Sequence, residues 1–265
     1  MGTKHDILTE EEMEKFSLSS VVDKEIKRFI AEKNGDLLSK QINILDCGCG
    51  RGRSVARLRE LGFNAFGVDV DEKTMLNGFD LLEKRGLIPS KLLRTVADVD
   101  SFPDGYFHII FSEQVFEHVS DLNGLIEMYE HKTLSQGIGV HSFPGAKMID
   151  ELHVMMPYIH WLPKNKLRKI YIALMLVCGK GPKKGAWLET KEKSFFEIVN
   201  VYYQYLDKKT FYRDNKKIAC LFAEHAFDVQ YKIGSQVLSN NKLNKNYFKR
   251  NGYPDNNIIF FVTKK

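Results

Sequence analysis

The chain has 265 residues, of which 43% are hydrophobic and 28% are charged, and its formal net charge is +5. This balance favours one globular domain with a full core and excludes a disordered or fibrous protein. No stretch reaches the roughly eighteen uninterrupted apolar residues of a membrane-spanning helix, and the acidic start of the chain lacks a signal-peptide pattern, so the sequence predicts a cytoplasmic protein.

The charge is unevenly distributed along the chain. Residues 1–150 contain 18 Lys and Arg against 25 Asp and Glu, whereas residues 151–265 contain 21 against 9. The two parts therefore carry net charges of −7 and +12. A basic C-terminal part suggests an acidic partner, such as a phosphorylated or carboxylated substrate, nucleic acid or an anionic membrane surface. The alternative is a lysine-rich surface that binds nothing.

Apolar periodicity predicts alternating helices and strands after an N-terminal segment, Ile7 to Lys33, that has the spacing of one or two amphipathic helices. Short apolar runs predict strands buried on both faces of a parallel sheet, at Ile42–Asp46, Ala65–Asp69, Leu92–Val96, His108–Phe111 and Gly139–Phe143. Predicted helices lie between them, at Ser54–Leu61, Lys73–Lys84 and Leu122–Leu134. This order indicates an open, doubly wound α/β sheet.

The alternation stops between Gly145 and Leu206, where aromatic and long aliphatic residues predict a helical insertion or lid. A helix near Thr210–His225, a strand near Asp228–Ile233 and a last strand at Ile258–Thr263 follow, with a polar Asn- and Lys-rich stretch before the last strand. We therefore expect an N-terminal helical cap (1–38), a ligand-binding core (39–145), a lid (146–206) and a C-terminal completion of the core (207–265).

The most informative stretch is Ile44–Gly52, in which a strand runs into the glycine turn Gly48-Cys-Gly-Arg-Gly52 and then a helix. Glycines allow a tight turn and close approach of a ligand to the backbone. The G-x-G-x-G spacing differs from the G-x-G-x-x-G of pyrophosphate-binding turns. Asp46 before the turn disfavours an anion, and Asp69 at the end of the second strand can accept bonds from two ribose hydroxyls. The pattern predicts a ligand with a ribose and a cationic group.

Cysteines and metals contribute little to this interpretation. Cys47, Cys49, Cys178 and Cys220 are too few for a disulfide scaffold, and no second Cys/His pair stands at zinc-ligand spacing from Cys47 and Cys49. We expect these cysteines to be small buried residues and predict no metal site.

With these residues the sequence resembles the class I S-adenosylmethionine-dependent methyltransferases, and within them the small-molecule branch of the ubiquinone and sterol type. Four ordered motifs within residues 40–145 carry the resemblance: Ile44–Gly52, Phe66–Asp71, Ala97-Asp98 before Phe102–Phe107, and Phe111–Val119. The resemblance implies a Rossmann-like, seven-stranded sheet that is mostly parallel with an antiparallel last strand.

The resemblance also implies S-adenosylmethionine as cofactor and S-adenosylhomocysteine as product. In that family the glycine loop packs beside the methionine part, the position of Asp69 holds the ribose and the position of Asp98 bonds the adenine amine. Carried over onto this sequence, the expected cofactor-lining residues are Asp46, Gly48, Cys49, Gly50, Asp69, Val70, Asp98, Val99 and Glu113.

A sulfonium methyl group is already activated, so catalysis requires alignment of the acceptor and, for a hydroxyl acceptor, a base. The candidate bases lie after the fourth and fifth strands or in the lid: His118, His141, His153 and His160. His118 can instead order a strand-to-helix turn, and His141 can be a core histidine. We therefore predict His153 as the first choice of base, His160 as the second, and His141 after them.

The sequence of the predicted lid gives information about the acceptor. Lys164, Lys166, Arg168 and Lys169 precede the apolar run Ile170–Cys178, which is too short to span a membrane but suits an interface with anionic headgroups. A helix that closes over a pocket has the same pattern, and we favour that alternative. The stretch Met156–Lys164 resembles methyltransferases of bacterial surface-polysaccharide biosynthesis, which implies a sugar or glycan hydroxyl as acceptor. Phosphorylated, nucleotide-linked and lipid-linked forms of this acceptor stay open.

Two other functions stay open at this point. A basic region with interleaved aromatic residues can bind RNA, but Ser112–Val115 after the fourth strand is not the Asn-Pro-Pro-Tyr type of motif found in amino-directed nucleic-acid methyltransferases, and no separate RNA-binding module is recognised. Nucleic acid is therefore not the expected partner. A non-catalytic S-adenosylmethionine-binding or scaffold protein is the second alternative. The sequence does not indicate the oligomeric state.

Overall fold

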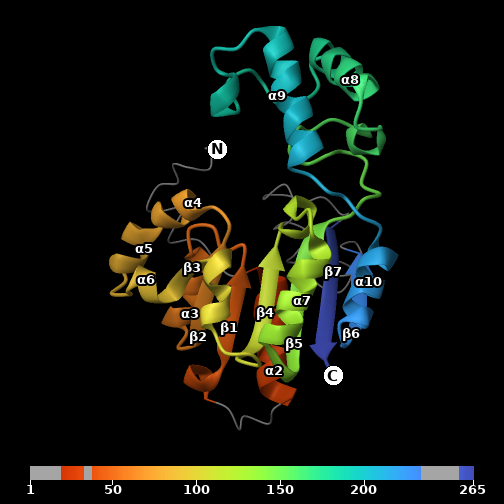
Figure 1. Cartoon of the computed structure of the whole chain (residues 1–265). Coiled ribbons are helices and arrows are strands. Elements are labelled where there is room, and N and C mark those ends of the chain that lie inside the picture. The colour runs from red at the N-terminus through yellow and green to blue at the C-terminus, as the bar shows by residue number, and fades with distance from the viewer. Residues whose placement is uncertain (1–18, 33–37, 234–256) are drawn as a thin grey trace.

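A seven-stranded sheet forms the centre of the molecule (Figure 1), and the computed structural model describes residues 19–32, 38–233 and 257–265. The strand order is β3-β2-β1-β4-β5-β7-β6. The strands are β1 (Asn43–Cys47), β2 (Asn64–Asp69), β3 (Leu93–Thr95), β4 (Phe107–Glu113), β5 (Thr133–Pro144), β6 (Phe227–Ile233) and β7 (Asn257–Lys264). β1 to β5 are parallel neighbours, and β7 runs antiparallel to both β5 and β6. The predicted doubly wound sheet with an antiparallel last strand is confirmed.

Apolar residues on both faces of the strands explain the layered arrangement. In β1, Ile44 belongs to one buried cluster and the next residue, Leu45, belongs to the other. Because successive side chains of a strand point to opposite faces, the central sheet is covered on both sides. Residues of α2 (Ser20–Glu32), α3 (Arg53–Glu60) and α5 (Phe79–Glu83) join the first cluster. Residues of α7 (Leu122–Lys132) and α10 (Asn215–Glu224) join the second.

One predicted helix is divided in the structure. The expected helix Lys73–Lys84 consists of α4 (Glu72–Leu76) and α5, and Gly78 lies between them. A Cβ atom at Gly78 would clash with the backbone carbonyl of Arg51, in the glycine turn after β1. The break therefore lets the chain pass close to that turn. The short helix α6 (Pro89–Leu92) then leads into β3.

Other boundaries moved by a few residues. β5 begins at Thr133 rather than at Gly139, so the predicted helix that was to end at Leu134 ends at Lys132. Part of the expected N-terminal helices, and the Asn- and Lys-rich stretch before β7, lie outside the described residues.

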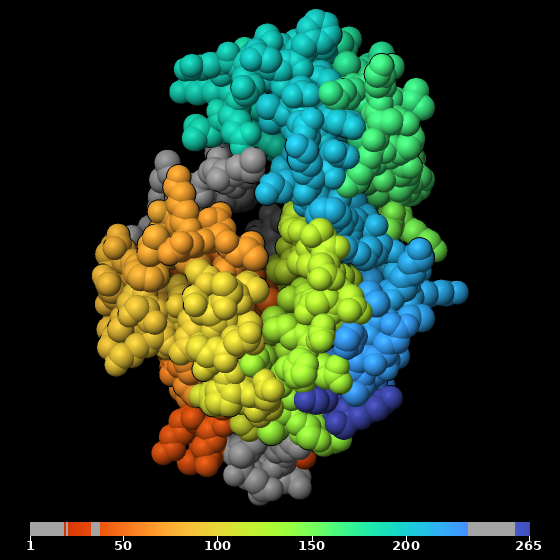
Figure 2. Space-filling model, in the orientation of Figure 1, coloured from red at the N-terminus to blue at the C-terminus, as the bar shows by residue number. Residues whose placement is uncertain are grey.

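The segment between β5 and α10 leaves the sheet and contains η5 (Ile159–Trp161), α8 (Lys166–Val177), η6 (Leu188–Thr190) and α9 (Phe195–Lys208). In Figure 1, α8 and α9 lie beyond the carboxyl ends of the parallel strands. This segment has an apolar cluster of its own, formed by Val154, Met156, Ile159, Ile172, Ile198, Val199, Tyr202 and Leu206. We call it the lid. Figure 2 shows a hollow between the lid and the part of the core that contains α4.

Within the described part of the chain, no helix has both the length and the apolar character needed to cross a membrane.

Candidate active site

The glycine turn after β1 is held against β2 and α4. Gly48, Gly50 and Gly52 all have left-handed φ angles, of 83°, 52° and 73°. The backbone N–H groups of Gly48 and Cys49 donate to the carbonyl of Val68, at 2.8 and 3.1 Å. The nearest atom to a Cβ placed on Gly50 would be Thr74 Cγ2 at 4.0 Å, so Gly50 borders open space. Side chains at these positions would meet a backbone conformation that favours glycine.

Asp69 joins the end of β2 to this turn. Its Oδ2 accepts a hydrogen bond from the backbone N–H of Gly50 at 2.8 Å, and its Oδ1 accepts from the N–H of Asp71 at 2.9 Å. Each oxygen keeps a further lone pair for a ligand. The next side chain, Val70, is 86% exposed, which is unusual for valine and places an apolar surface beside this carboxylate.

An acidic pair lies at the ends of the neighbouring strands β1 and β4, where Asp46 is buried and Glu113 is half-buried. Burial and the nearby Glu113 and Asp69 carboxylates raise the pKa of Asp46 well above its usual value, and a hydrogen bond from Ser54 opposes the shift. Burial likewise raises the pKa of Glu113, against a hydrogen bond with Ser19. A cation brought between these groups would be stabilised, because it would relieve the repulsion between the carboxylates.

Asp98 and Val99 lie in η3 (Val96–Ser101), directly after β3. Asp98 is exposed, and its Oδ2 accepts a hydrogen bond from Thr95 Oγ1 at 2.6 Å. Asp98 and Thr95 also line a cavity of about 470 Å³ whose opposite side is formed by residues of α4. Val99 and Cys49 are buried in the two core clusters, so their side chains face the interior. Cys47 is buried as expected, whereas the expectation was wrong for Cys178 and Cys220, which are exposed.

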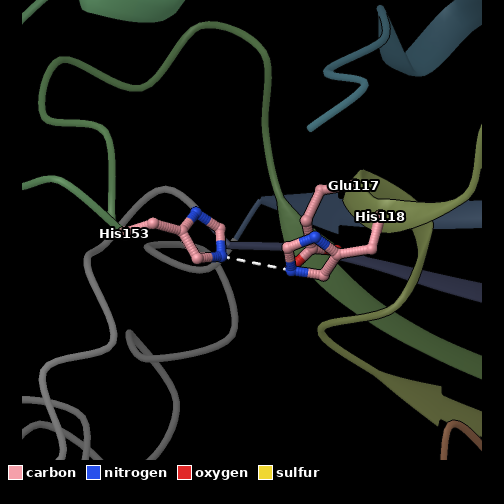
Figure 3. A group of neighbouring side chains, drawn as sticks. All are labelled: Glu117, His118 and His153. Atoms are coloured by element: carbon pink, nitrogen blue, oxygen red, sulfur yellow. Dashed lines mark hydrogen bonds and ion pairs between the residues drawn. The ribbon is translucent and has the colours of Figure 1, made fainter. Parts of the chain in front are cut away.

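Two histidines meet where the lid approaches the core (Figure 3). His118 lies in η4 (Phe116–His118), after β4, and His153 lies in the lid. Their Nε2 atoms are 3.1 Å apart, and their rings stand at 73° to each other. Glu117 lies beside them, with its Oε1 3.8 Å from His118 Nε2. The structure thus brings together two candidate bases that are 35 positions apart in the sequence.

His153 is held by a buried carboxylate. Its Nδ1 lies 2.6 Å from Oε1 of the fully buried Glu151, which also accepts the N–H groups of His153 and Val154 and the hydroxyl of Tyr212. Although burial opposes it, Glu151 raises the pKa of His153, and the bonds from His153 lower the pKa of Glu151. Burial lowers the pKa of His118. The pair therefore consists of a more basic and a less basic imidazole.

The segment between α9 and α10 fixes the position of η4. The guanidinium of Arg213 donates to the carbonyls of Phe116, Val119 and Ser120, and the N–H of Phe211 donates to the carbonyl of Glu117 at 2.7 Å. The carbonyl of Lys209 lies 2.7 Å from His118 Nδ1. These bonds orient His118 toward the lid.

The other two predicted bases lie apart from this pair. His141 is 1% exposed within β5, stacks on Tyr129 at 8° and on Phe116 at 25°, and pairs with Ser112 Oγ at 2.9 Å; burial lowers its pKa to about 3. This placement corresponds to the core alternative. His160 lies in η5 beside Tyr212, with ring centroids 5.1 Å apart, and burial lowers its pKa.

The sequence analysis did not assign roles to Glu117, Glu151 or Tyr212. Glu151 could have been found from its position two residues before His153, since a carboxylate at that distance can turn back onto the ring. Tyr212 is 59 positions from His153, and no local pattern connects them.

Comparisons with known proteins agree with the fold. Residues 45–138 match the family model described as "Methyltransferase domain". The chain is 28% identical over 104 residues to the ubiquinone biosynthesis O-methyltransferase of Caulobacter sp. (strain K31), covering 39% of this chain and 41% of that protein. It is 28% identical over 143 residues to the protein of the same name from Rickettsia prowazekii (strain Madrid E), covering 52% and 56%.

The chain thus spans about half the length of the curated relatives it matches. Among solved structures, an S-adenosylmethionine-dependent methyltransferase from Mesorhizobium loti aligns with a TM-score of 0.52 and 13% identity, over 88% of this chain and 96% of that one. At 13% identity, this similarity supports the fold and not a shared activity.

Proposed function

We propose that the protein is a class I S-adenosylmethionine-dependent methyltransferase that transfers a methyl group from this cofactor to a hydroxyl of a small-molecule acceptor. The match of residues 45–138 to the methyltransferase-domain family model and the two O-methyltransferase relatives support this proposal. The observation that carries the proposal is the convergence of Asp46, Asp69 and Glu113, at the ends of three neighbouring strands, below a lid that presents His153. In open α/β sheets, ligands bind at the carboxyl ends of the strands.

The residues present fit the cofactor. The acidic pair Asp46 and Glu113 suits the cationic groups of S-adenosylmethionine, and the free lone pairs of Asp69 suit two ribose hydroxyls. Asp98 would accept from the adenine amine, with the side chain of Val70 and the backbone of Val99 beside the base. Gly48, Cys49 and Gly50 would form the turn along the methionine part. When bound, the cofactor supplies an electrophilic methyl group on a sulfonium.

The chain's own contribution to the reaction is to place the acceptor and to accept its proton. His153 Nε2 is the leading base, because Glu151 holds the ring through Nδ1 and stabilises the imidazolium that forms. The proton of the acceptor hydroxyl would pass to Nε2 as the oxygen takes the methyl group, while the methyl–sulfur bond would break and S-adenosylhomocysteine would leave.

We propose a sugar or glycan hydroxyl as the acceptor. Tyr158 and Trp161 are exposed in the lid with ring centroids 5.1 Å apart, and aromatic faces of this kind can stack on sugar rings. The net charge of +12 over residues 151–265 would attract a phosphate or nucleotide group attached to the sugar. The two curated relatives are named as O-methyltransferases, which supports oxygen as the methylated atom.

Calorimetric titration with S-adenosylmethionine and S-adenosylhomocysteine, followed by a methyl-transfer screen over nucleotide sugars and glycans, tests the proposal. We expect micromolar binding of at least one of the two compounds and transfer to a sugar hydroxyl. Binding without transfer to any hydroxyl acceptor would contradict the acceptor class, and failure of folded protein to bind either compound would contradict the cofactor site.

We also propose that the lid contacts an anionic membrane surface that presents a lipid-linked acceptor. Leu167, Ile170, Leu174 and Val177 are each more than half exposed and follow one another at intervals of three or four residues on α8. Lysines surround this stripe, and together they have the amphipathic pattern of an interfacial helix. Lys164 and Lys169 have partners within the lid, the Asp207 carbonyl and Asn200, so they are poor test positions.

Sedimentation with vesicles tests this contact. We expect binding to vesicles that contain phosphatidylglycerol, weaker binding to phosphatidylcholine alone, and loss of binding in an Ile170→Ser/Leu174→Ser variant. Leu61→Ser, at an exposed leucine of the core, is the matched control. Equal sedimentation of both variants would contradict the contact, and a change of oligomeric state in the double variant would assign the stripe to a second copy of the chain.

A further inference from the structure

We propose that Glu117, His118 and His153 form a binding site for one divalent transition-metal ion, with Zn²⁺ as the best fit, between the core and the lid. The sequence analysis predicted no metal site, because it considered only ligands at short spacing. The metal site stands on the geometry of these three residues, whereas its use in methyl transfer rests on the proposed function.

The distances suit a small tetrahedral ion. One ligand atom from each of the three residues lies within 4.8 Å of the others, and the two Nε2 atoms are 3.1 Å apart. With metal–nitrogen bonds of about 2.0–2.1 Å, two nitrogens of a tetrahedral Zn²⁺ site lie about 3.3 Å apart. The Nε2 atoms thus need to move by only tenths of an ångström, and the Glu117 carboxylate must approach His118 Nε2 from 3.8 Å.

The hydrogen bonds fix the tautomers of both rings. His118 Nδ1 faces the carbonyl of Lys209, and His153 Nδ1 faces the carboxylate of Glu151. A carbonyl or carboxylate oxygen only accepts, so each Nδ1 carries a hydrogen. In their neutral forms both Nε2 atoms then carry a lone pair at the 3.1 Å contact between the two rings. Two such lone pairs repel each other at 3.1 Å unless a proton or a metal ion lies between them.

The carboxylate of Glu117 gives independent support for a metal ion, as opposed to a proton shared between the two rings. Its side chain is 1% exposed, and neither carboxylate oxygen has a hydrogen-bond partner within the described part of the chain. Leaving a buried carboxylate unpaired is costly, so such groups commonly bind a cation or neutralise. A divalent ion beside Glu117 would supply the partner that its carboxylate lacks.

The surroundings match those of metal-binding histidines. Such histidines commonly donate their other ring N–H to a carboxylate or a backbone carbonyl, and the two rings here do both. Tyr212 supports Glu151 from behind. Two imidazoles with one carboxylate favour Zn²⁺, Co²⁺, Ni²⁺ or Cu²⁺ over Mg²⁺ and Ca²⁺. Three protein ligands leave a fourth position open, as in catalytic zinc sites.

In the metal-loaded protein His153 is a ligand and not a base. The ion would then act as a Lewis acid that lowers the pKa of the acceptor hydroxyl, whose proton passes to solvent before the oxygen attacks the methyl group. Metal binding would also join the lid to the core through His153 and His118.

The test starts from chelator-treated full-length protein. Zn²⁺ affinity is measured by competition with a chromophoric chelator, and Co²⁺ binding by its visible ligand-field bands. We expect one equivalent to bind, and each of Glu117→Gln, His118→Asn and His153→Gln to weaken binding by more than the roughly 10–100-fold that is typical for loss of an outer partner. Tyr212→Phe, which alters an outer partner, should weaken metal binding by no more than that factor.

His225→Gln is the matched control, because His225 forms a similar pair with Glu130, Nδ1 to Oε2 at 2.9 Å, away from this cluster. It should leave metal affinity unchanged. Circular dichroism and thermal unfolding establish that each variant is folded. For any variant that fails to fold, Cu²⁺ paramagnetic resonance of the wild-type protein replaces it, and we expect coupling to two imidazole nitrogens.

Absence of stoichiometric binding, unchanged affinity in all three ligand variants, or fewer than two coordinated imidazoles would overturn the proposal. Calorimetry with S-adenosylmethionine on the same metal-free and metal-loaded samples separates the two claims. Metal binding without cofactor binding would contradict the proposed function alone. Cofactor binding with equal methyl transfer in metal-free protein would leave His153 as the base and overturn the metal's role in the reaction.

Discussion

His118 Nε2 lies 3.1 Å from His153 Nε2, and this contact joins the end of the fourth core strand to the lid. Both rings are held from behind, His118 by the carbonyl of Lys209 and His153 by Glu151. The lid therefore contributes one of the two rings of this pair. We expect changes to the pair to separate cofactor binding from turnover.

Replacing His153 should leave cofactor binding intact and remove most of the activity. A positioned base typically contributes a factor of roughly 10²–10⁴, and we expect His153→Gln to lose turnover within that range at unchanged affinity for S-adenosylmethionine. His225→Gln, at a histidine that pairs with Glu130 away from the site, is the control. Equal turnover of the His153 variant and the wild type would exclude His153 from the reaction.

Replacing Asp69 should weaken cofactor binding. Asp69→Ala removes the carboxylate that links Gly50 to β2 and that we expect to accept from the ribose. Hydrogen bonds to charged groups contribute about 1.5–3 kcal/mol, so calorimetry should show cofactor affinity reduced by roughly 10–100-fold. Asp80→Ala, at an exposed aspartate of α5, should bind normally. An Asp69 variant with wild-type affinity would show that the ribose lies elsewhere.

Stability should fall on acidification because His141 is buried. Its pKa is lowered from 6.5 to about 3 in the folded protein, so between these values the unfolded chain binds the proton and the folded chain does not. The free energy of unfolding therefore falls as the pH drops from about 6.5 toward 3. Above pH 6.5 His141 is neutral in both states, and no stability is lost through it. Urea unfolding at pH 7 and pH 5 measures the loss, which should shrink in His141→Leu. An equal pH dependence in that variant would assign the loss to other groups.

Gly78 should be intolerant of a side chain. A Cβ there would meet the carbonyl of Arg51, and the glycine turn would have to shift. We expect Gly78→Ala to lose about 1–3 kcal/mol of unfolding free energy, as overpacking usually does, together with cofactor affinity. Gly86→Ala is the comparison, because φ is 70° but nothing lies within 4 Å. It should cost only about 1–2 kcal/mol for the left-handed backbone and leave cofactor affinity unchanged.

The sequence was sufficient for the features that local patterns encode. The strand, glycine turn and helix around Gly48 to Gly52 follow from apolar spacing and glycine positions, and they occur as expected. The break at Gly78 was not predicted, because its cause is a backbone carbonyl 27 positions earlier in the chain.

The lid also contains features that local sequence patterns do not predict. A histidine in the lid near the end of β4 could be anticipated, but the orientations of the two rings could not. His153 contacts Tyr212, and His118 contacts the carbonyl of Lys209, and both partners are distant in the sequence. Whether Glu117 is partnered depends on what packs around it in three dimensions, so sequence spacing could not indicate a cluster with His118 and His153.

The position of β7 constrains the order in which the molecule can assemble. This last strand lies between β5 and β6, and it is the neighbour that both of them share on that side of the sheet. Until residues 257–264 arrive, one edge of β5 is open and β6 has no partner in the sheet, although both precede β7 in the chain. Closing this gap joins segments more than a hundred residues apart, which is a slow kind of contact to form. A nascent or truncated chain would therefore expose two strand edges, with the tendency to aggregate that such edges bring.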